Sequence, residues 1–136
     1  MAADEAPIAA DYRRERLDGL TGTIIGAAQR VSSVLGYGFL EKVYENALRV
    51  ELLRRGLAVQ QQFPLQVRYE SEVVGDYVAD LIVGNEVIVE LKAVTTLDHV
   101  HHVQCVHYLR ATGMQVCLLL NFGRRSLEVR RIVNRF

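Results

Sequence analysis

Val87-Ile88-Val89-Glu90-Leu91-Lys92 is an apolar hexapeptide interrupted by one acid and one amine. Its β-branched residues predict a buried strand, and residues two apart in a strand lie on the same face of the sheet. We therefore expect Glu90 and Lys92 to point together out of a buried segment. Because buried charged groups are normally paired, hydrogen-bonded or bound to a metal, these two side chains need partners.

A second acid, Asp80, lies ten positions before Glu90, in the preceding apolar run at 74–83. The residues between the two runs predict a hairpin turn. A two-residue turn would place Asp80 opposite Val89 and facing away from Glu90. A three-residue loop over 84–86 would instead place Asp80 opposite Glu90. Shared chemistry by the two acids therefore requires the three-residue loop.

Two converging carboxylates repel each other, and a divalent cation such as Mg²⁺ or Mn²⁺ relieves the repulsion. Asp80 and Glu90 are therefore candidate metal ligands, and the backbone carbonyl of Leu91 is a third. Beside such an ion, Lys92 could hold a water molecule or stabilise charge on a phosphate. These parts suit metal-assisted hydrolysis of phosphodiester bonds. Taken alone, the hairpin is also compatible with a surface ion pair between Glu90 and Lys92.

Hydrophobic periodicity places this hairpin within a mixed α/β domain. Apolar residues recur at helical spacing in three segments, at 17–35, 40–55 and 99–111. Alternating or continuous apolar runs predict five strands, at 63–70, 74–83, 87–92, 116–120 and 127–133. The predicted order is ααβββαββ, with a mixed β-sheet flanked by helices. We expect residues 1–16 to form a loose or partly helical N-terminal arm and residues 17–136 to form a single domain.

Charge and cysteine content narrow the class of protein. The formal net charge of the 136 residues is zero, whereas a tight non-specific duplex binder is usually basic. Contacts with nucleic acid would then depend on local patches. The last sixteen residues offer one, since a single acid, Glu128, stands there against Arg124, Arg125, Arg130, Arg131 and Arg135. A solvated edge strand explains those arginines equally well. Two cysteines, no secretory signal and no long apolar run predict a cytoplasmic protein without a membrane segment.

Two motifs on predicted helices supply further candidate polar side chains for the site at the hairpin. Residues 38–44 read G-x-x-E-x-x-Y where the second predicted helix begins, with Glu41 and Tyr44 one turn apart on the same face. Glu41 alone is explained by its favourable interaction with the helix dipole. Gln104 and Tyr108 lie at positions i and i+4 of the third predicted helix, where a polar pair could hold a substrate strand.

These motifs, together with 77–80, 90–93 and 121–123, resemble the GxxExxY family, a small-domain branch of the PD-(D/E)xK nuclease-like superfamily. They are also similar to the motif set of RecB-like exonucleases. The resemblance extends from about Leu17 to Val133. The family is named for its motif and not for an activity. Ala79 stands here where the superfamily's name has a proline.

The resemblance implies a restriction-endonuclease-like core and assigns roles to the residues above. Asp80 and Glu90 would bind the metal, Lys92 would be catalytic, and Glu41 would be a supporting acid at the metal. Gln104 and Tyr108 would face the substrate. Apart from the resemblance, we expect Tyr44, Arg130 and Arg131 to bind substrate as well.

The histidines near the third predicted helix form the other dense polar cluster. His99 and His102, at positions i and i+3, could bind a transition metal. No cysteine or carboxylate is well placed to complete a tetrahedral set, which favours a structural or solvated role. Two alternatives remain for these histidines. His99 or His107 could lie near the phosphates of a bound substrate, or His101 could belong to a pH-sensitive surface.

We therefore expect a Mg²⁺- or Mn²⁺-dependent nuclease that acts on DNA more readily than on RNA, at ends or in flexible structures. A chain of this length has little room for a separate recognition domain, so a homodimer or a partner protein would select the substrate. The alternative is a non-catalytic module of the PD-(D/E)xK fold that binds nucleic acid or a partner protein.

Overall fold

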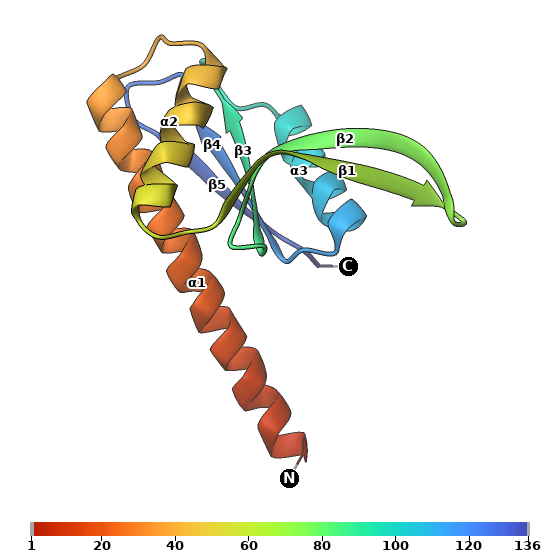
Figure 1. The fold of residues 1–136 in the computed structure, drawn as a ribbon. Coiled ribbons are helices and arrows are strands. Elements are labelled where there is room, and N and C mark those ends of the chain that lie inside the picture. Colours follow the sequence, from red (N-terminus) through yellow and green to blue (C-terminus); the bar gives the residue numbers. More distant parts are fainter. Residues whose placement is uncertain (1, 136) are drawn as a thin grey trace.

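The computed structural model describes the backbone of residues 2–135 and the side chains from residue 10 onward. Its elements follow the expected order of two helices, three strands, one helix and two strands. They are α1 (Ala2–Leu35), α2 (Glu41–Arg54), β1 (Val59–Tyr69), β2 (Glu72–Val83), β3 (Val87–Lys92), α3 (His99–Thr112), β4 (Val116–Asn121) and β5 (Glu128–Val133). The predicted α/β class and the ααβββαββ order are therefore confirmed (Figure 1).

The five strands form one sheet in the order β1-β2-β3-β4-β5. Only the β3–β4 pair is parallel, so the sheet is mixed, as expected. The helix α3 provides the crossover that a parallel pair needs. Beyond this central part, the long β1–β2 hairpin curves away past α3 (Figure 1).

Two apolar cores lie on opposite faces of the sheet because successive strand residues alternate in direction. The first core packs α1 and α2 against one face; it includes Ile24, Leu48, Leu81, Val89 and Leu118. The second packs α3 against the other face; it includes Cys105, Leu109, Ile82, Ile88 and Leu119. This alternation in β3 places Glu90 and Lys92 on the α3 side, with Ile88.

The N-terminal segment, expected as a loose or partly helical arm, is helical in the structure, since α1 extends back to Ala2. Packing against the sheet begins only at Leu17. Once that packed part is helical, each further residue adds a hydrogen bond without a new nucleation cost. Residues 11–16 of the arm are accordingly helical but exposed, and Ala10 before them is half-buried. Within residues 2–135, none of the helices is both long and apolar enough to cross a membrane.

The β2–β3 register confirms the three-residue loop over 84–86. Val83 pairs with Val87, and Leu81 pairs with Val89. The next position along the hairpin therefore places Asp80 opposite Glu90, as the predicted site requires.

Candidate active site

Asp80 and Glu90 meet where the regular pairing of β2 and β3 ends. The Asp80 backbone N–H donates to Glu90 Oε1 at 2.8 Å, and the Leu91 backbone N–H donates to Asp80 Oδ2 at 2.9 Å. Each carboxylate thus accepts a bond from the opposite strand. These reciprocal bonds replace ladder hydrogen bonds and hold the two carboxyl groups, hereafter the acid pair, at the point where the strands part.

Burial makes it unfavourable for both members of the acid pair to be charged. Glu90 is 3% exposed, and desolvation together with the negative charge of Asp80 raises its pKa to about 9. Desolvation also raises the pKa of Asp80 to about 6, and the negative charges of Glu45 and Glu41 contribute. The ammonium group of Lys92 lowers both pKa values without offsetting these effects. Near neutral pH and without a further cation, the pair therefore retains a proton.

The helix α2 brings two acids toward Asp80, of which only Glu41 was expected. Glu45, one turn later, is almost fully buried and accepts hydrogen bonds from Lys42 at 2.9 Å and from the side chain of Gln61. Its charge acts on Asp80 more strongly than that of Glu41 does. The only signal for Glu45 in the sequence is its i+4 spacing from Glu41, and that signal does not reveal burial.

Gln62 is a second residue that the sequence did not point to. The β1–β2 register pairs Gln61 with Leu81 and Phe63 with Ala79, and Gln62 and Asp80 lie unpaired between them. Gln62 has a φ of 54°, in the left-handed region that costs a non-glycine residue about 1 kcal/mol or more. Its side-chain amide donates to both carboxylate oxygens of Glu45 at 3.0 Å. The interruption of pairing at Asp80 is thus stabilised by an α2 acid.

The end of β3, immediately after Lys92, is held by Asn121 at the end of β4. The Asn121 side chain accepts from Val94 N–H at 3.0 Å and donates to the Val94 carbonyl at 2.9 Å. Gly123 allows the chains to approach closely, since a Cβ atom there would lie 2.3 Å from the Val94 carbonyl oxygen. The Asn121-Phe122-Gly123 segment therefore fixes the backbone that carries Lys92.

Replacing Gly123 by alanine is expected to lower the free energy of unfolding by about 2 kcal/mol or more, because backbone atoms must move to admit the new methyl group. Gly22→Ala is the matched control. A Cβ atom at Gly22 in α1 meets nothing within 4 Å, so that variant should be neutral or slightly stabilised. Urea denaturation measures both. Equal stability of the two variants would show that the backbone near Val94 moves to admit the methyl group without a loss in the free energy of unfolding.

Comparison with known proteins bears directly on this arrangement. The family model of the PD-(D/E)XK nuclease superfamily matches residues 18–132. The chain belongs to this superfamily. Among solved structures, the crystal structure of an alkaline exonuclease (LHK-Exo) from Laribacter hongkongensis matches with 15% identity and a TM-score of 0.43, over 79% of this chain and 76% of that chain. None of the curated proteins matches at a significant level.

Within this PD-(D/E)XK domain, Tyr44 does not lie where a substrate-binding role needs it. Its side chain is fully buried; the hydroxyl donates to the Gly36 carbonyl at 2.7 Å and accepts from the Phe39 N–H at 3.2 Å. Its ring stacks on Phe122, with centroids 4.9 Å apart. Tyr44 thus holds the loop that leads into α2 and Glu41, and we do not assign it to substrate.

Gln104 and Tyr108 lie together beside the acid pair. The Gln104 side-chain amide donates to the Tyr108 hydroxyl at 2.9 Å, and that hydroxyl donates to the Val78 carbonyl at 3.2 Å. Burial, followed by the charges of Glu90 and Asp80, raises the pKa of Tyr108 and keeps the phenol neutral. Because Tyr108 is 3% exposed, Gln104 is the more accessible of the two.

Arg130 and Arg131 do not form one patch with the acid pair. They are successive residues of the edge strand β5, so their side chains leave opposite faces. Arg131 pairs with Asp18 of α1 at 2.8 Å, and Arg130 lies 3.6 Å from Glu128. The whole of β4 separates them from β3. Their assignment as phosphate-binding residues stays a prediction, at a place in the sheet apart from the acid pair.

The histidine cluster has a structural role at the start of α3. Asp98 accepts from the Val100 N–H, and His101 Nδ1 accepts from the Asp98 N–H, which together cap the helix. The rings of His99 and His102 stack 6.0 Å apart. Among the described side chains, no three or more His, Cys, Asp or Glu residues are grouped to hold a metal. The role of Glu41 as a supporting acid at the metal stays a prediction, and its charge acts on Asp80.

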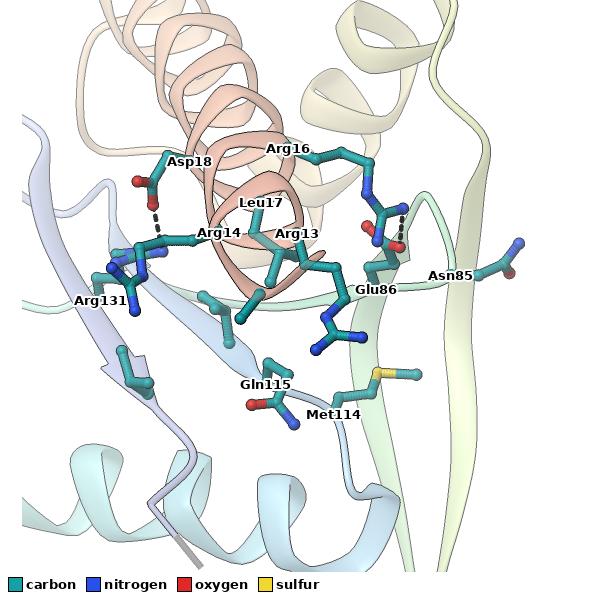
Figure 2. A pocket seen from close by; sticks show the side chains of 13 residues that line it. Arg13, Arg14, Arg16, Leu17, Asp18, Asn85, Glu86, Met114, Gln115 and Arg131 are labelled. Carbon is teal, nitrogen blue, oxygen red and sulfur yellow. Dashed lines mark hydrogen bonds and ion pairs between the residues drawn. The ribbon is translucent and has the colours of Figure 1, made fainter. Parts of the chain in front are cut away.

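A cavity that neither Asp80 nor Glu90 lines lies beside α1 (Figure 2). Its volume is about 790 Å³, and it is enclosed by α1, the β2–β3 turn and the start of β4. We call it the α1 crevice. Its arginines include Arg16, which pairs with Glu86, and Arg131, which pairs with Asp18. Much of its positive charge is thus already compensated within the protein.

Proposed function

We propose that the protein is a nuclease that uses Mg²⁺ or Mn²⁺ to hydrolyse phosphodiester bonds of DNA. The observation that carries this proposal is the pair of reciprocal hydrogen bonds between Asp80, Glu90 and the opposite strands. They hold two carboxyl groups together in a setting that penalises their joint ionisation. A bound divalent cation would remove that penalty, and the superfamily match supports a nuclease.

The residues present suit such an ion. One oxygen of each carboxylate accepts a backbone bond, and the second oxygen of each can serve as a ligand. The Leu91 N–H points toward β2, and in a strand the carbonyl of the same residue points to the same side, which places the Leu91 carbonyl toward the acid pair. Substrate oxygens and water would complete the ligand set, as Mg²⁺ prefers. When bound, the ion stabilises charge on the phosphate and lowers the pKa of a bound water.

Lys92 is the residue we assign to the chemical step. It lies on the face of β3 that carries Glu90, and its charge acts on both members of the acid pair. From there the ammonium group can orient a water or stabilise the charge that develops on the phosphate. Gln104, bonded to Tyr108, would position the substrate strand next to it.

The decisive experiment is cleavage of labelled single-stranded, duplex and branched DNA with Mg²⁺, with Mn²⁺ or with chelator. We expect ion-dependent cleavage by the wild type and its loss in Asp80→Asn, which keeps the side-chain shape but removes the charge. A matching RNA substrate tests the preference for DNA. Cleavage that persists in chelator or in Asp80→Asn would contradict the proposal.

One observation favours a second function. The acid pair offers two carboxylates without a grouped third side-chain ligand among the described residues. A non-catalytic module that binds nucleic acid would have no use for a third ligand. That module should bind labelled DNA with equal affinity in Mg²⁺ and in chelator, and should cleave none of the substrates.

A further inference from the structure

A groove of about 570 Å³ runs between α3 and the β1–β2 hairpin, where the hairpin curves past the helix (Figure 1). We call it the hairpin groove. The strands contribute Gln66, Val67, Arg68 and Tyr77, and α3 contributes His107, Arg110 and Ala111. Its volume falls within the range of sites that bind small molecules or short polymer segments.

The charge of the hairpin groove has a single sign. Among the described residues that line it, Arg68 and Arg110 are cationic and none is acidic. The Arg68 guanidinium donates to the Ser71 carbonyl and to Gln66 Oε1, which are neutral acceptors, so its charge is not compensated there. In the α1 crevice, by contrast, carboxylates pair with Arg16 and Arg131. In a chain with zero net charge, the hairpin groove is therefore a local site for an anion.

An aromatic side chain lies within the groove. Tyr77 is 44% exposed, and its ring makes an edge contact with Tyr108 at a centroid distance of 6.0 Å and an interplanar angle of 65°. That contact orients the ring and leaves much of it accessible. Tyr108 is itself bonded to Gln104 and electrostatically linked to Glu90. The two tyrosines thus connect the groove with the acid pair.

We propose that the hairpin groove binds an unpaired nucleic-acid strand that leads to the acid pair, with Tyr77 against a base and Arg68 at a phosphate. This proposal rests on the proposed nuclease function. Cationic side chains beside an exposed aromatic ring suit a single strand, since bases offer their faces for stacking only when they are unpaired. In a duplex the neighbouring base pairs cover those faces. The groove would thereby select single-stranded ends and flaps.

Binding measured without cleavage tests the groove directly. In chelator, a fluorescein-labelled dT12 strand should bind the full-length wild type more tightly than a 12-base-pair duplex does, by fluorescence anisotropy. Tyr77→Ala is expected to weaken single-strand binding about tenfold, and Tyr77→Phe to retain it. Arg68→Ala should weaken binding across sequences and flatten its dependence on salt. Arg13→Ala, which removes the same charge from the α1 crevice, is the matched control and should bind like the wild type.

A second measurement separates failure of the groove from failure of the nuclease function. Bis(p-nitrophenyl) phosphate is a small diester that can reach the acid pair without occupying the groove. If the wild type hydrolyses it with Mn²⁺ while Tyr77→Ala and Arg68→Ala still bind dT12 normally, the groove proposal is overturned and the nuclease function stands. If groove variants lose dT12 binding but the wild type cleaves neither diester nor DNA, the groove proposal holds and the nuclease function is wrong. Equal affinity for duplex and single strand, or an equal loss in Arg13→Ala, also overturns the groove proposal.

Discussion

Lys92→Ala is expected to reduce the turnover of DNA at least about a hundredfold, as loss of a contact made in the transition state does. Its affinity for DNA in chelator should change little, because the phosphate contacts that we propose for binding lie in the hairpin groove. Single-turnover cleavage at saturating protein measures the chemical step apart from binding. A loss confined to that step would identify Lys92 as a catalytic residue.

Lys92→Met is the matched variant, since it keeps a long apolar side chain and removes only the ammonium group. It should fold like the wild type and lose activity to the same extent as Lys92→Ala. Full activity in both variants would place the chemistry elsewhere. Loss of folding in both would make Lys92 an ion-pair partner of the acid pair, and the binding-module function would then be favoured.

Glu90→Gln is expected to abolish activity and yet to stabilise the metal-free protein at pH 8. Glu90 has its pKa raised from an ordinary 4.5 to about 9 in the folded state. The unfolded chain therefore loses this proton near pH 4.5 while the folded protein keeps it. The free energy of unfolding should fall as pH rises from about 5 to about 9 and level off above that range. Glutamine removes the effect and still accepts the Asp80 N–H bond, so the gain at pH 8 should be about 1 kcal/mol or more.

Adding a metal ion is expected to reverse the relative stability of the wild type and Glu90→Gln. Millimolar Mg²⁺ or Mn²⁺ should raise the thermal midpoint of the wild type, because the ion binds the folded state, and should have little effect on Glu90→Gln. Glu51→Gln is a control: Glu51 lies on α2, pairs with Arg30 and Arg55, and should not alter the metal response. An equal response in Glu90→Gln would locate the ion elsewhere, with His99 and His102 as the next candidates.

The local sequence pattern was sufficient to predict the hairpin and the order of the helices and strands. Alternation and turn residues predict β2 and β3 because the side-chain period of a strand is two. They leave a loop of two or three residues open, and the structure has the three-residue loop over 84–86. The register that joins Asp80 to Glu90 follows from the loop length alone. Helical spacing likewise predicted that Gln104 and Tyr108 share a face, and the two side chains are in fact bonded.

Such local patterns do not predict contacts between segments that lie far apart in the chain. Glu45 and Gln62 come together 17 positions apart because α2 packs beside β1, and neither periodicity nor spacing encodes that approach. Tyr44 was assigned to substrate from its motif, whereas its ring is buried against Phe122 of a distant strand end. The last sixteen residues were expected to form one basic patch because they hold five arginines, whereas Arg130 and Arg131 leave opposite faces of β5.

The sequence thus determines locally which segments form the hairpin and where it turns, and it limits the register to two choices, because those features depend on neighbours within about ten residues. The structure selects the register that joins Asp80 to Glu90. The burial that raises the pKa of Glu90, the second acid of α2 and the cationic hairpin groove arise only from packing. Desolvation and long-range charge depend on which distant segments exclude water from a side chain, and that property belongs to the folded molecule.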